Sequence, residues 1–533
     1  MPDPPAAQVD LLGINFRRMT HTIYAGYIEP RMTEITESYA ALRETLSEIV
    51  ATELAVVRPP LRPAAAAGPL QDRGLIAWLG RRVRRAGAEA KREPPSEREE
   101  RELEAWRAEV ATSEDPARIA ACRALIRLAL AIRSRHGRWW GDQQLLGSIA
   151  VGLACNEYGS QAIGRLIEPW IGEACRREGY ARLARQERPV IMNVKGASAS
   201  GKSTMRQLQK QMAAELGLRW SDFALISPDI WRKYLLDYAS LGEDYKYAGA
   251  LAGHELAIID QKLDRYMARK AVEGAIPHLL IDRFRFDSFA PDSDEAGSNL
   301  LTRFGQSIYM LFMITPPHET VVRAWKRGLE VGRYKTVDDL LAHNVEAYAG
   351  MPGLFFTWAL HPGKSVHYEF LDNCVPPGER PKTVAFGWHG EMNILDVKGI
   401  IDIDRFRKID VDASTPIDVY RDAATMLPEN NTDFMCQCVR KIAAVNFADR
   451  DTGRIYARFE SGRPVRTDPG LLARALEDEE TRTGLCAVAP GIERRISPGG
   501  PLRKLRPDRF RTVGRWGERP NRLQKANGSI DPK

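Results

Sequence analysis

A glycine-rich stretch near the middle of the chain is the clearest sign of chemistry. Residues 196–203 read Gly-Ala-Ser-Ala-Ser-Gly-Lys-Ser, which fits the phosphate-binding pattern G-x-x-x-x-G-K-[ST]. In such a loop the backbone N–H groups converge on an anion, and the following helix adds the partial positive charge of its N-terminus. Lys202 would neutralise the β- and γ-phosphates of a nucleoside triphosphate, and Ser203 would ligate Mg²⁺. The predicted site for ATP and Mg²⁺ comprises Gly196, Ala197, Ser198, Ala199, Ser200, Gly201, Lys202, Ser203 and Thr204.

Two carboxylates follow apolar runs that are typical of strands. Asp229 comes just after Phe223–Ser227, and Asp282 ends the run His278–Asp282. The C-terminal ends of parallel strands form the ligand-binding rim of α/β folds, so both side chains would reach the γ-phosphate region. In a kinase, Asp229 would take the proton of the substrate hydroxyl, although Asp is equally a good helix N-cap. Asp282 would orient Mg²⁺ or a water, and the two carboxylates could exchange roles.

Basic residues supply candidate contacts to phosphate. Arg323, Lys326 and Arg327 share one face of a predicted helix, and Arg333 follows it. Such a cationic face suits a lid that closes over phosphates and stabilises charge in the transition state; the alternative is a solvated basic face.

Further candidates for substrate contact are His254, Glu255, Arg283 and Arg285. His254 would project away from the apolar stripe of its helix, toward either solvent or the substrate cleft. The pair His254-Glu255 does not begin a zinc-binding H-E-x-x-H, because Ile258 stands where the second His belongs. The two arginines would reach phosphate or pair with neighbouring aspartates.

The elements that would position these residues begin at Pro189, where short apolar runs alternate with amphipathic helices. The expected strands are 190–194, 223–227, 278–282 and 307–315, and the expected helices lie near 203–216, 250–272 and 317–329. This alternation predicts an α/β fold, a parallel sheet of the P-loop NTPase type with flanking helices.

The expected organisation has four parts. Residues 1–187 read as a mainly helical region with linkers near 58–74 and 92–98, and residues 188–375 as the P-loop kinase domain. A strand is also expected at 366–370, near the end of that domain. A small α+β extension covers 376–489, with strands expected at 384–386 and 394–397 and a hairpin around Asp451-Thr452-Gly453. The tail 490–533 is expected to be disordered.

Charge singles out this tail. The chain of 533 residues carries a formal charge of +7, but residues 490–533 contain twelve Lys/Arg and four Asp/Glu, which leaves 65 basic and 66 acidic residues before them. The basicity that could attract nucleic acid therefore belongs to the tail, together with a cluster at 81–85. Seven scattered cysteines do not resemble a disulfide framework, and no export or membrane-spanning signal is seen. A cytoplasmic location is expected, with secretion as an effector left open.

The chain resembles the zeta-toxin group of P-loop kinases, relatives of polynucleotide kinase and chloramphenicol phosphotransferase. The resemblance is carried, in this order, by Gly196–Thr204, Asp229-Ile230-Trp231-Arg232, the His254 helix, Ile281-Asp282 and Arg323–Arg333. The resemblance covers about a third of the chain, 190–358. It implies Asp229 as catalytic base and Arg323, Arg327 and Arg333 as contacts to ATP phosphates. Ser227 stands where the family often has a second Asp, and Asp282-Arg283-Phe284 replaces its E-G-T-like segment. The resemblance therefore does not fix the toxins' nucleotide-sugar as the acceptor, and the NAD-like nucleotides that some relatives phosphorylate stay open.

The leading hypothesis is an ATP- and Mg²⁺-dependent kinase that phosphorylates a hydroxyl of a nucleotide, nucleotide-sugar or related small molecule. The alternative is a nucleic-acid-binding ATPase or polynucleotide 5′-hydroxyl kinase that uses the basic tail. A P-loop interaction switch without chemistry is the least favoured, because Asp229 would then only cap a helix. An antitoxin or other regulatory protein is a further partner that the resemblance admits, and no membrane contact is expected.

Overall fold

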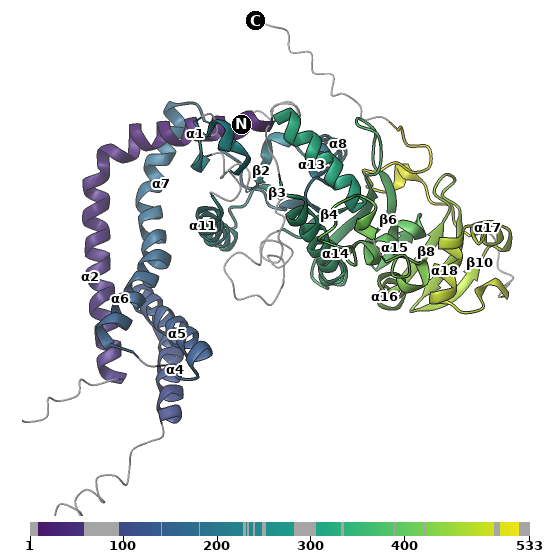
Figure 1. Ribbon diagram of the computed structural model, residues 1–533. Helices are drawn as coiled ribbons and strands as arrows, with labels where there is room; N and C mark the ends of the chain where they lie inside the picture. The colour runs from purple at the N-terminus through teal and green to yellow at the C-terminus, as the bar shows by residue number, and fades with distance from the viewer. Residues whose placement is uncertain are drawn as a thin grey trace, which may run out of the picture. The chain divides into compact units, whose positions relative to one another are not determined.

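The computed structural model describes residues 9–57, 95–139, 141–180, 182–227, 231, 234–237, 240–247, 252–281, 305–331, 335–388, 390–420, 422–494 and 502–521 (Figure 1). The chain divides into two units: Thr20–Tyr180, and Met1–Met19 together with Ala181–Lys533. No helix in the described part of the chain combines the length and the apolar composition needed to cross a membrane.

The regular elements described before residue 181 are helices. They are α1 (Val9–Ile23), α2 (Met32–Val57), α4 (Pro95–Thr112), α5 (Pro116–His136), α6 (Gln143–Ala154) and α7 (Ser160–Arg177). Helix α5 shows why the boundaries fall where they do. Asp115 accepts a hydrogen bond from the N–H of Ala117, Pro116 occupies the first helical position, and Gly137 ends the helix at φ +72°. The core of this unit packs α2, α4, α5 and α6 around Trp106 and Trp139, both fully buried.

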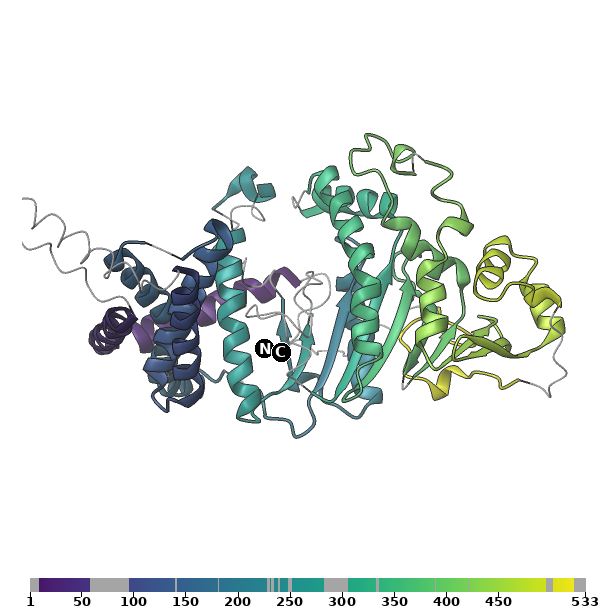
Figure 2. The same cartoon turned by 90° about the horizontal axis from the view of Figure 1, so that it is seen from below.

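The second unit is built on one ten-stranded sheet in the order β10-β9-β8-β7-β6-β5-β4-β1-β3-β2 (Figure 2). The strands are β1 (Val190–Lys195), β2 (Phe223–Ile226), β3 (His278–Ile281), β4 (Ser307–Ile314), β5 (Ser365–Asp372), β6 (Lys382–Trp388), β7 (Glu391–Ile394), β8 (Ala444–Ala448), β9 (Ile455–Glu460) and β10 (Arg463–Thr467). Neighbours in the block β2-β3-β1-β4-β5 are parallel. The four strands expected before residue 316 are confirmed, because each is a buried apolar run.

The extension continues the same sheet. Strand β6 is antiparallel to β5 and β7, whereas β7 and β8 are parallel. Two expectations in this region have different outcomes. The hairpin at 451–453 is confirmed, since it joins antiparallel β8 and β9, with Gly453 at φ +69°. The strand expected at 394–397 is wrong: β7 ends at Ile394, and Asp396 caps helix α15 (Val397–Phe406) by accepting from the N–H of Gly399.

Helices cover the two faces of the sheet unequally. One face packs against α14 (Val337–Ala359), α15 and α16 (Asp433–Lys441), which share its main apolar core. The other face packs against α8 (Met205–Glu215) and, further along the sheet, against residues 502–521. The remaining helices are α11 (Gly253–Val272), α13 (Pro317–Val331), α17 (Pro469–Ala475) and α18 (Glu479–Val488).

Residues 502–521 correct the expectation of a wholly disordered tail. Leu505, Val513 and Trp516 are buried, and Trp516 packs on Phe386 of β6. The buried carboxylate of Glu369 accepts hydrogen bonds from the N–H groups of Val513 and Gly514, at 2.6 and 2.9 Å. A few apolar residues and one carboxylate acceptor therefore order this segment, despite its basic composition.

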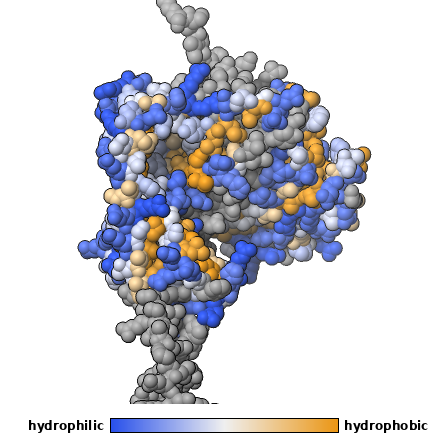
Figure 3. Space-filling model, turned by 60° about the vertical axis from the view of Figure 1, so that its left-hand side comes forward, coloured by the Kyte–Doolittle hydropathy of each residue, from blue (hydrophilic) through white to orange (hydrophobic). Residues whose placement is uncertain are grey.

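The surface is mixed in character: the face shown in Figure 3 is largely hydrophilic, with separate apolar patches. Three of the exposed apolar side chains, Val322, Trp325 and Leu329, lie on α13.

Candidate active site

The glycine-rich loop lies at the C-terminal end of β1, the strand with β3 on one side and β4 on the other. The chain passes from β1 to β2 on one side of the sheet, and then from β3 to β4 on the other side of β1. This reversal makes the end of β1 the topological switch point, where α/β sheets leave a crevice for ligands. Helix α8 begins directly after the loop, preceded by one 3₁₀ turn at Lys202–Thr204, so its N-terminus faces that crevice.

Close approach explains the two glycines of the loop. A Cβ atom on Gly201, at φ +93°, would lie 2.1 Å from Nδ2 of Asn373. A Cβ on Gly196 would lie 2.7 Å from Oγ of Ser200 and 2.8 Å from Cβ of Met313. Between them Ala199 has φ +60°, a conformation that a residue with a side chain rarely adopts. Such local strain is typical of loops whose backbone must face a ligand.

Lys202 folds back over this loop. Its Nζ donates to the carbonyl oxygens of Gly196 and Ala197, at 2.9 and 2.7 Å. The ammonium therefore lies above the turn, where phosphate oxygens could replace the carbonyl contacts. Lysine serves phosphate in this way as a compact point charge.

Two neighbouring strand ends hold the loop in place. The carbonyl oxygen of Ser200 accepts from Oγ1 of Thr315, at 3.2 Å, and from Nδ2 of Asn373, at 2.8 Å. Thr315 follows β4 and Asn373 follows β5, and both are buried. The main-chain N–H and carbonyl of Thr315 are in turn bonded to the hydroxyl of Tyr348 on α14, each at 2.8 Å. A rigid frame thus fixes the loop from one side.

The two arginines of α13 turn inward, whereas Lys326 is exposed. Arg323 donates from Nη2 to the carbonyl oxygen of Asn373 at 2.7 Å, so it lies beside the strand end that holds the loop. Arg323 and Arg327 are only partly exposed, whereas Trp325 and Leu329 are 60% and 63% exposed. A solvated basic face would show the opposite distribution. Arg327 also lies close enough to Lys335 to help lower its pKa, although burial is the larger cause and Asp339 opposes both.

A buried polar side chain lies beneath the loop. Asn193, in the middle of β1, is fully buried, and neither its Oδ1 nor its Nδ2 finds a hydrogen-bond partner in the described part of the chain. An unpartnered buried carboxamide is costly, so simple core packing does not explain an Asn three residues before the loop.

The structure leaves several predicted site residues untested. Asp229, Asp282, Arg283, Arg285 and Arg333 lie outside the described residues, as does the side chain of Ser203. His254 and Glu255 are exposed at the start of α11 and make no hydrogen bond or ion pair with the described residues. Of the predicted side chains that are described, Lys202 and Arg323 are therefore tied to the loop, directly or through Asn373, whereas His254 and Glu255 are not.

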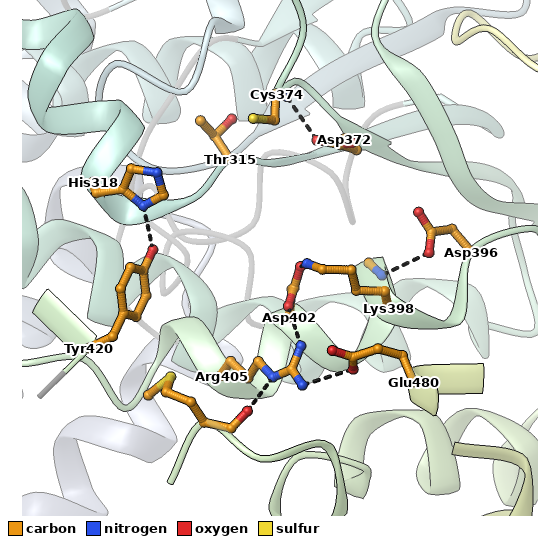
Figure 4. A network of polar contacts seen from close by, with 12 residues as sticks. Thr315, His318, Asp372, Cys374, Asp396, Lys398, Asp402, Arg405, Tyr420 and Glu480 are labelled. Carbon is orange, nitrogen blue, oxygen red and sulfur yellow. Dashed lines mark hydrogen bonds and ion pairs between the residues drawn. The ribbon is translucent and has the colours of Figure 1, made fainter. Parts of the chain in front are cut away.

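A second group of polar residues lies along the same edge, beyond β5 (Figure 4). Asp372 ends β5 and accepts from the N–H of Cys374 at 2.8 Å, and Asp396 follows β7 and pairs with Arg450. On α15, Lys398 pairs with Asp402. Sequence reasoning missed these residues, although Asp372 and Asp396 come at or just after the end of an apolar run in the sequence, as Asp229 and Asp282 do.

Most of this second group is already paired. Arg405 donates to Asp402, to Glu480 and to the carbonyl oxygen of Met426, at 2.9, 2.8 and 2.7 Å, which ties α15 to α18. Burial acts to lower the pKa of Lys398, but the charge of Asp402 and its hydrogen bond outweigh this and raise it. Lys398 is therefore a stable cation in the first turn of α15, with its side chain 56% exposed.

No cluster of three or more metal-ligating side chains occurs among the residues that the structure describes. In phosphoryl-transfer sites Mg²⁺ is held by one or two protein oxygens and by the phosphates themselves, so a pre-formed cluster is not required.

Comparison of the chain with protein-family models, with curated proteins and with solved structures finds no match.

Proposed function

We propose that this protein is an ATP-dependent kinase that transfers the γ-phosphoryl group to a hydroxyl of a nucleotide, nucleotide-sugar or related small molecule. The observation that carries the proposal is the loop Gly196–Thr204 at the switch point of the parallel block, with the ammonium of Lys202 folded over its turn. A strained, externally braced loop before a helix N-terminus is a site for phosphate. The inward-facing arginines of α13 add cations on the same side.

The roles follow from the chemistry of each group. Lys202 and the loop N–H groups would bind the β- and γ-phosphates, and Ser203 and Asp282 would hold Mg²⁺, which neutralises developing charge. Asp229 would accept the proton of the acceptor hydroxyl. Arg323 would keep Asn373, and through it the loop, in position. Because Arg323 already donates to that carbonyl, it acts on phosphate through its remaining N–H groups or through the loop.

The two sides of the loop differ in what they offer. Strands β2 and β3 lie on one side of β1, and in the sequence Asp229 comes three residues after β2 and Asp282 directly after β3. On the other side Thr315 follows β4, Asp372 ends β5 and Asn373 follows it. We therefore assign the acceptor to the β2–β3 side, where its hydroxyl meets the proposed base, and the nucleoside of ATP to the β4–β5 side.

Transfer of label from γ-labelled ATP tests the proposal. The acceptor panel is NAD, nucleotide-sugars, nucleosides and an oligonucleotide with a 5′-hydroxyl, each with and without Mg²⁺. Asp229→Asn should lower the transfer rate about 10²- to 10⁴-fold while ATP still binds, because the variant removes only the base. Transfer that survives this substitution unchanged would remove Asp229 from the mechanism.

The same panel separates the two kinase hypotheses. Label on the oligonucleotide alone, lost with rising salt, would favour the polynucleotide kinase alternative. Release of labelled phosphate with no labelled acceptor would indicate an ATPase. The proposed small-molecule kinase predicts neither outcome.

A further inference from the structure

A pocket away from the glycine-rich loop lies between the sheet and the segment 503–512. It has a volume of about 170 Å³ and is lined by residues of β4, β5, β6 and β7, by Met212 of α8 and by that segment. Tyr309 and His367 are each the third residue of their strands, β4 and β5. At about 3.3 Å per residue these two side chains are therefore roughly 16 Å from the strand ends that hold the loop.

Aromatic rings form the floor of this pocket. Tyr309, His367 and Trp388 are neighbours across β4, β5 and β6. Tyr309 stacks on His367 with ring centroids 4.7 Å apart and planes 10° from parallel, and Trp388 meets the edge of His367, also at 4.7 Å. Trp388 is 36% exposed, which is unusual for so large an apolar ring in a packed sheet. A cavity of about 150 Å³ is enough for a single benzene-sized ring.

Polar groups surround the rings at the mouth. Arg511 donates from Nη1 to the hydroxyl of Tyr309 at 2.8 Å and forms no ion pair with any described residue. Arg503 reaches Glu391 at 3.3 Å. Oε1 of Glu391 accepts hydrogen bonds from Arg503 and, at 3.1 Å, from Nδ2 of Asn446. Its Oε2 accepts none from the described residues. The mouth thus offers a free guanidinium face for an anion and a free carboxylate oxygen for an N–H donor.

The charge around the mouth favours an anion as well. Residues 502–521 contain seven Arg and Lys and two acidic residues. Arg503, Lys504, Arg506, Arg509 and Arg511 are all exposed. Arg503 is paired with Glu391, whereas no ion pair with a described residue neutralises Arg511. The pocket therefore combines a flat aromatic floor with one unpaired guanidinium.

We propose that this pocket binds a nucleoside monophosphate unit, with its base on the Trp388–His367 rings and its phosphate on Arg511. A nucleobase has a flat ring that would stack on these side chains and N–H groups that would donate to Glu391. The negative phosphate would pair with the guanidinium of Arg511. The unit is either a free nucleotide or the end of a nucleic acid strand, since both present the same chemistry. This site does not depend on the proposed kinase activity.

Equilibrium binding of AMP and of a ten-nucleotide oligoadenylate, measured by calorimetry, tests the proposal. All measurements use the full chain with Lys202→Ala, so that binding at the glycine-rich loop does not contribute. Either probe should bind saturably, and Trp388→Ala should weaken it about 5- to 150-fold, the effect of losing one stacking ring. Trp388→Phe should bind within a few-fold of the parent, because it keeps an aromatic face.

The phosphate contact is tested at Arg511, whose side chain is exposed. Arg511→Gln should weaken AMP binding and leave adenosine binding unchanged, while the matched variant Arg509→Gln should alter neither. Binding of AMP identifies a free nucleotide as ligand, and binding of the oligonucleotide alone identifies a strand end. Absence of saturable binding by both probes up to about 10 mM, or binding that is indifferent to Trp388→Ala and to Arg511→Gln, overturns the proposal.

Discussion

Replacement of Gly201 by Ala tests whether the loop is shaped by close packing. An alanine there must adopt φ +93°, which costs about 1–2 kcal/mol for a residue with a side chain. Its Cβ would also lie 2.1 Å from Nδ2 of Asn373, so that amide must leave the carbonyl of Ser200. The lost hydrogen bond of a buried group adds about 1–3 kcal/mol.

Together these terms amount to about 2–5 kcal/mol, since ATP would bind only the undistorted loop. The expected result is an ATP dissociation constant raised about 30- to 4,000-fold in calorimetry. Gly217→Ala is the matched control at the other end of α8: Gly217 has φ +71° but no atom within 4 Å of a built Cβ. It should cost about 1 kcal/mol of stability and leave ATP binding unchanged.

Combining Gly201→Ala with Asn373→Ala should cost less than the sum of the two single changes, because the second removes the clashing amide. Equal ATP affinities for Gly201→Ala and Gly217→Ala would refute the reasoning, and so would strict additivity in the double variant.

Three further outcomes follow from buried groups. Asn193→Leu should raise the free energy of unfolding in urea by about 1–3 kcal/mol while lowering activity, because it removes an unpartnered carboxamide; a less stable variant would contradict this. Burial raises the pKa of Glu369, so folding favours its protonated form. The free energy of unfolding of the wild type should therefore increase relative to that of Glu369→Gln as pH falls from 8 toward 4.5, and a decrease would contradict this. Burial raises the pKa of Cys122 to about 12, so mass spectrometry after iodoacetamide at pH 8 should find it unmodified while exposed Cys374 reacts; early loss of the Cys122 thiol would be inconsistent.

Much of the parallel block could be predicted because local and tertiary signals agree there. Val190–Lys195 and Ser307–Ile314 are mostly apolar, apart from Asn193, Lys195 and Ser307, and both strands are buried on both faces. The loop was predictable for the same reason, since its pattern stands between a strand and a helix. The run Ile394–Val397 misled because it continues across a strand end, a cap and a helix start. Asp396 carried the contrary signal, as a good N-cap.

The parts of the site that sequence could not supply depend on contacts between distant segments. Asn373 braces Ser200 across 173 positions of the chain, and no local pattern encodes that bond. The inward turn of Arg323 and Arg327 reverses the usual rule that charged faces meet water. Val513 and Trp516 are spaced among arginines without a helical or strand period, so their burial on the sheet follows only from the fold.

The transfer rate of label from γ-labelled ATP, compared between Lys202→Ala and Lys210→Ala, tests the central claim most directly. Each variant removes one lysine. Lys202 begins the 3₁₀ turn before α8 and lies over the loop, whereas Lys210 lies within α8 and is exposed. The account predicts loss of ATP binding and of transfer for Lys202→Ala, and wild-type rates for Lys210→Ala. Equal transfer by the two variants would contradict the assignment of this loop as the site that holds the triphosphate.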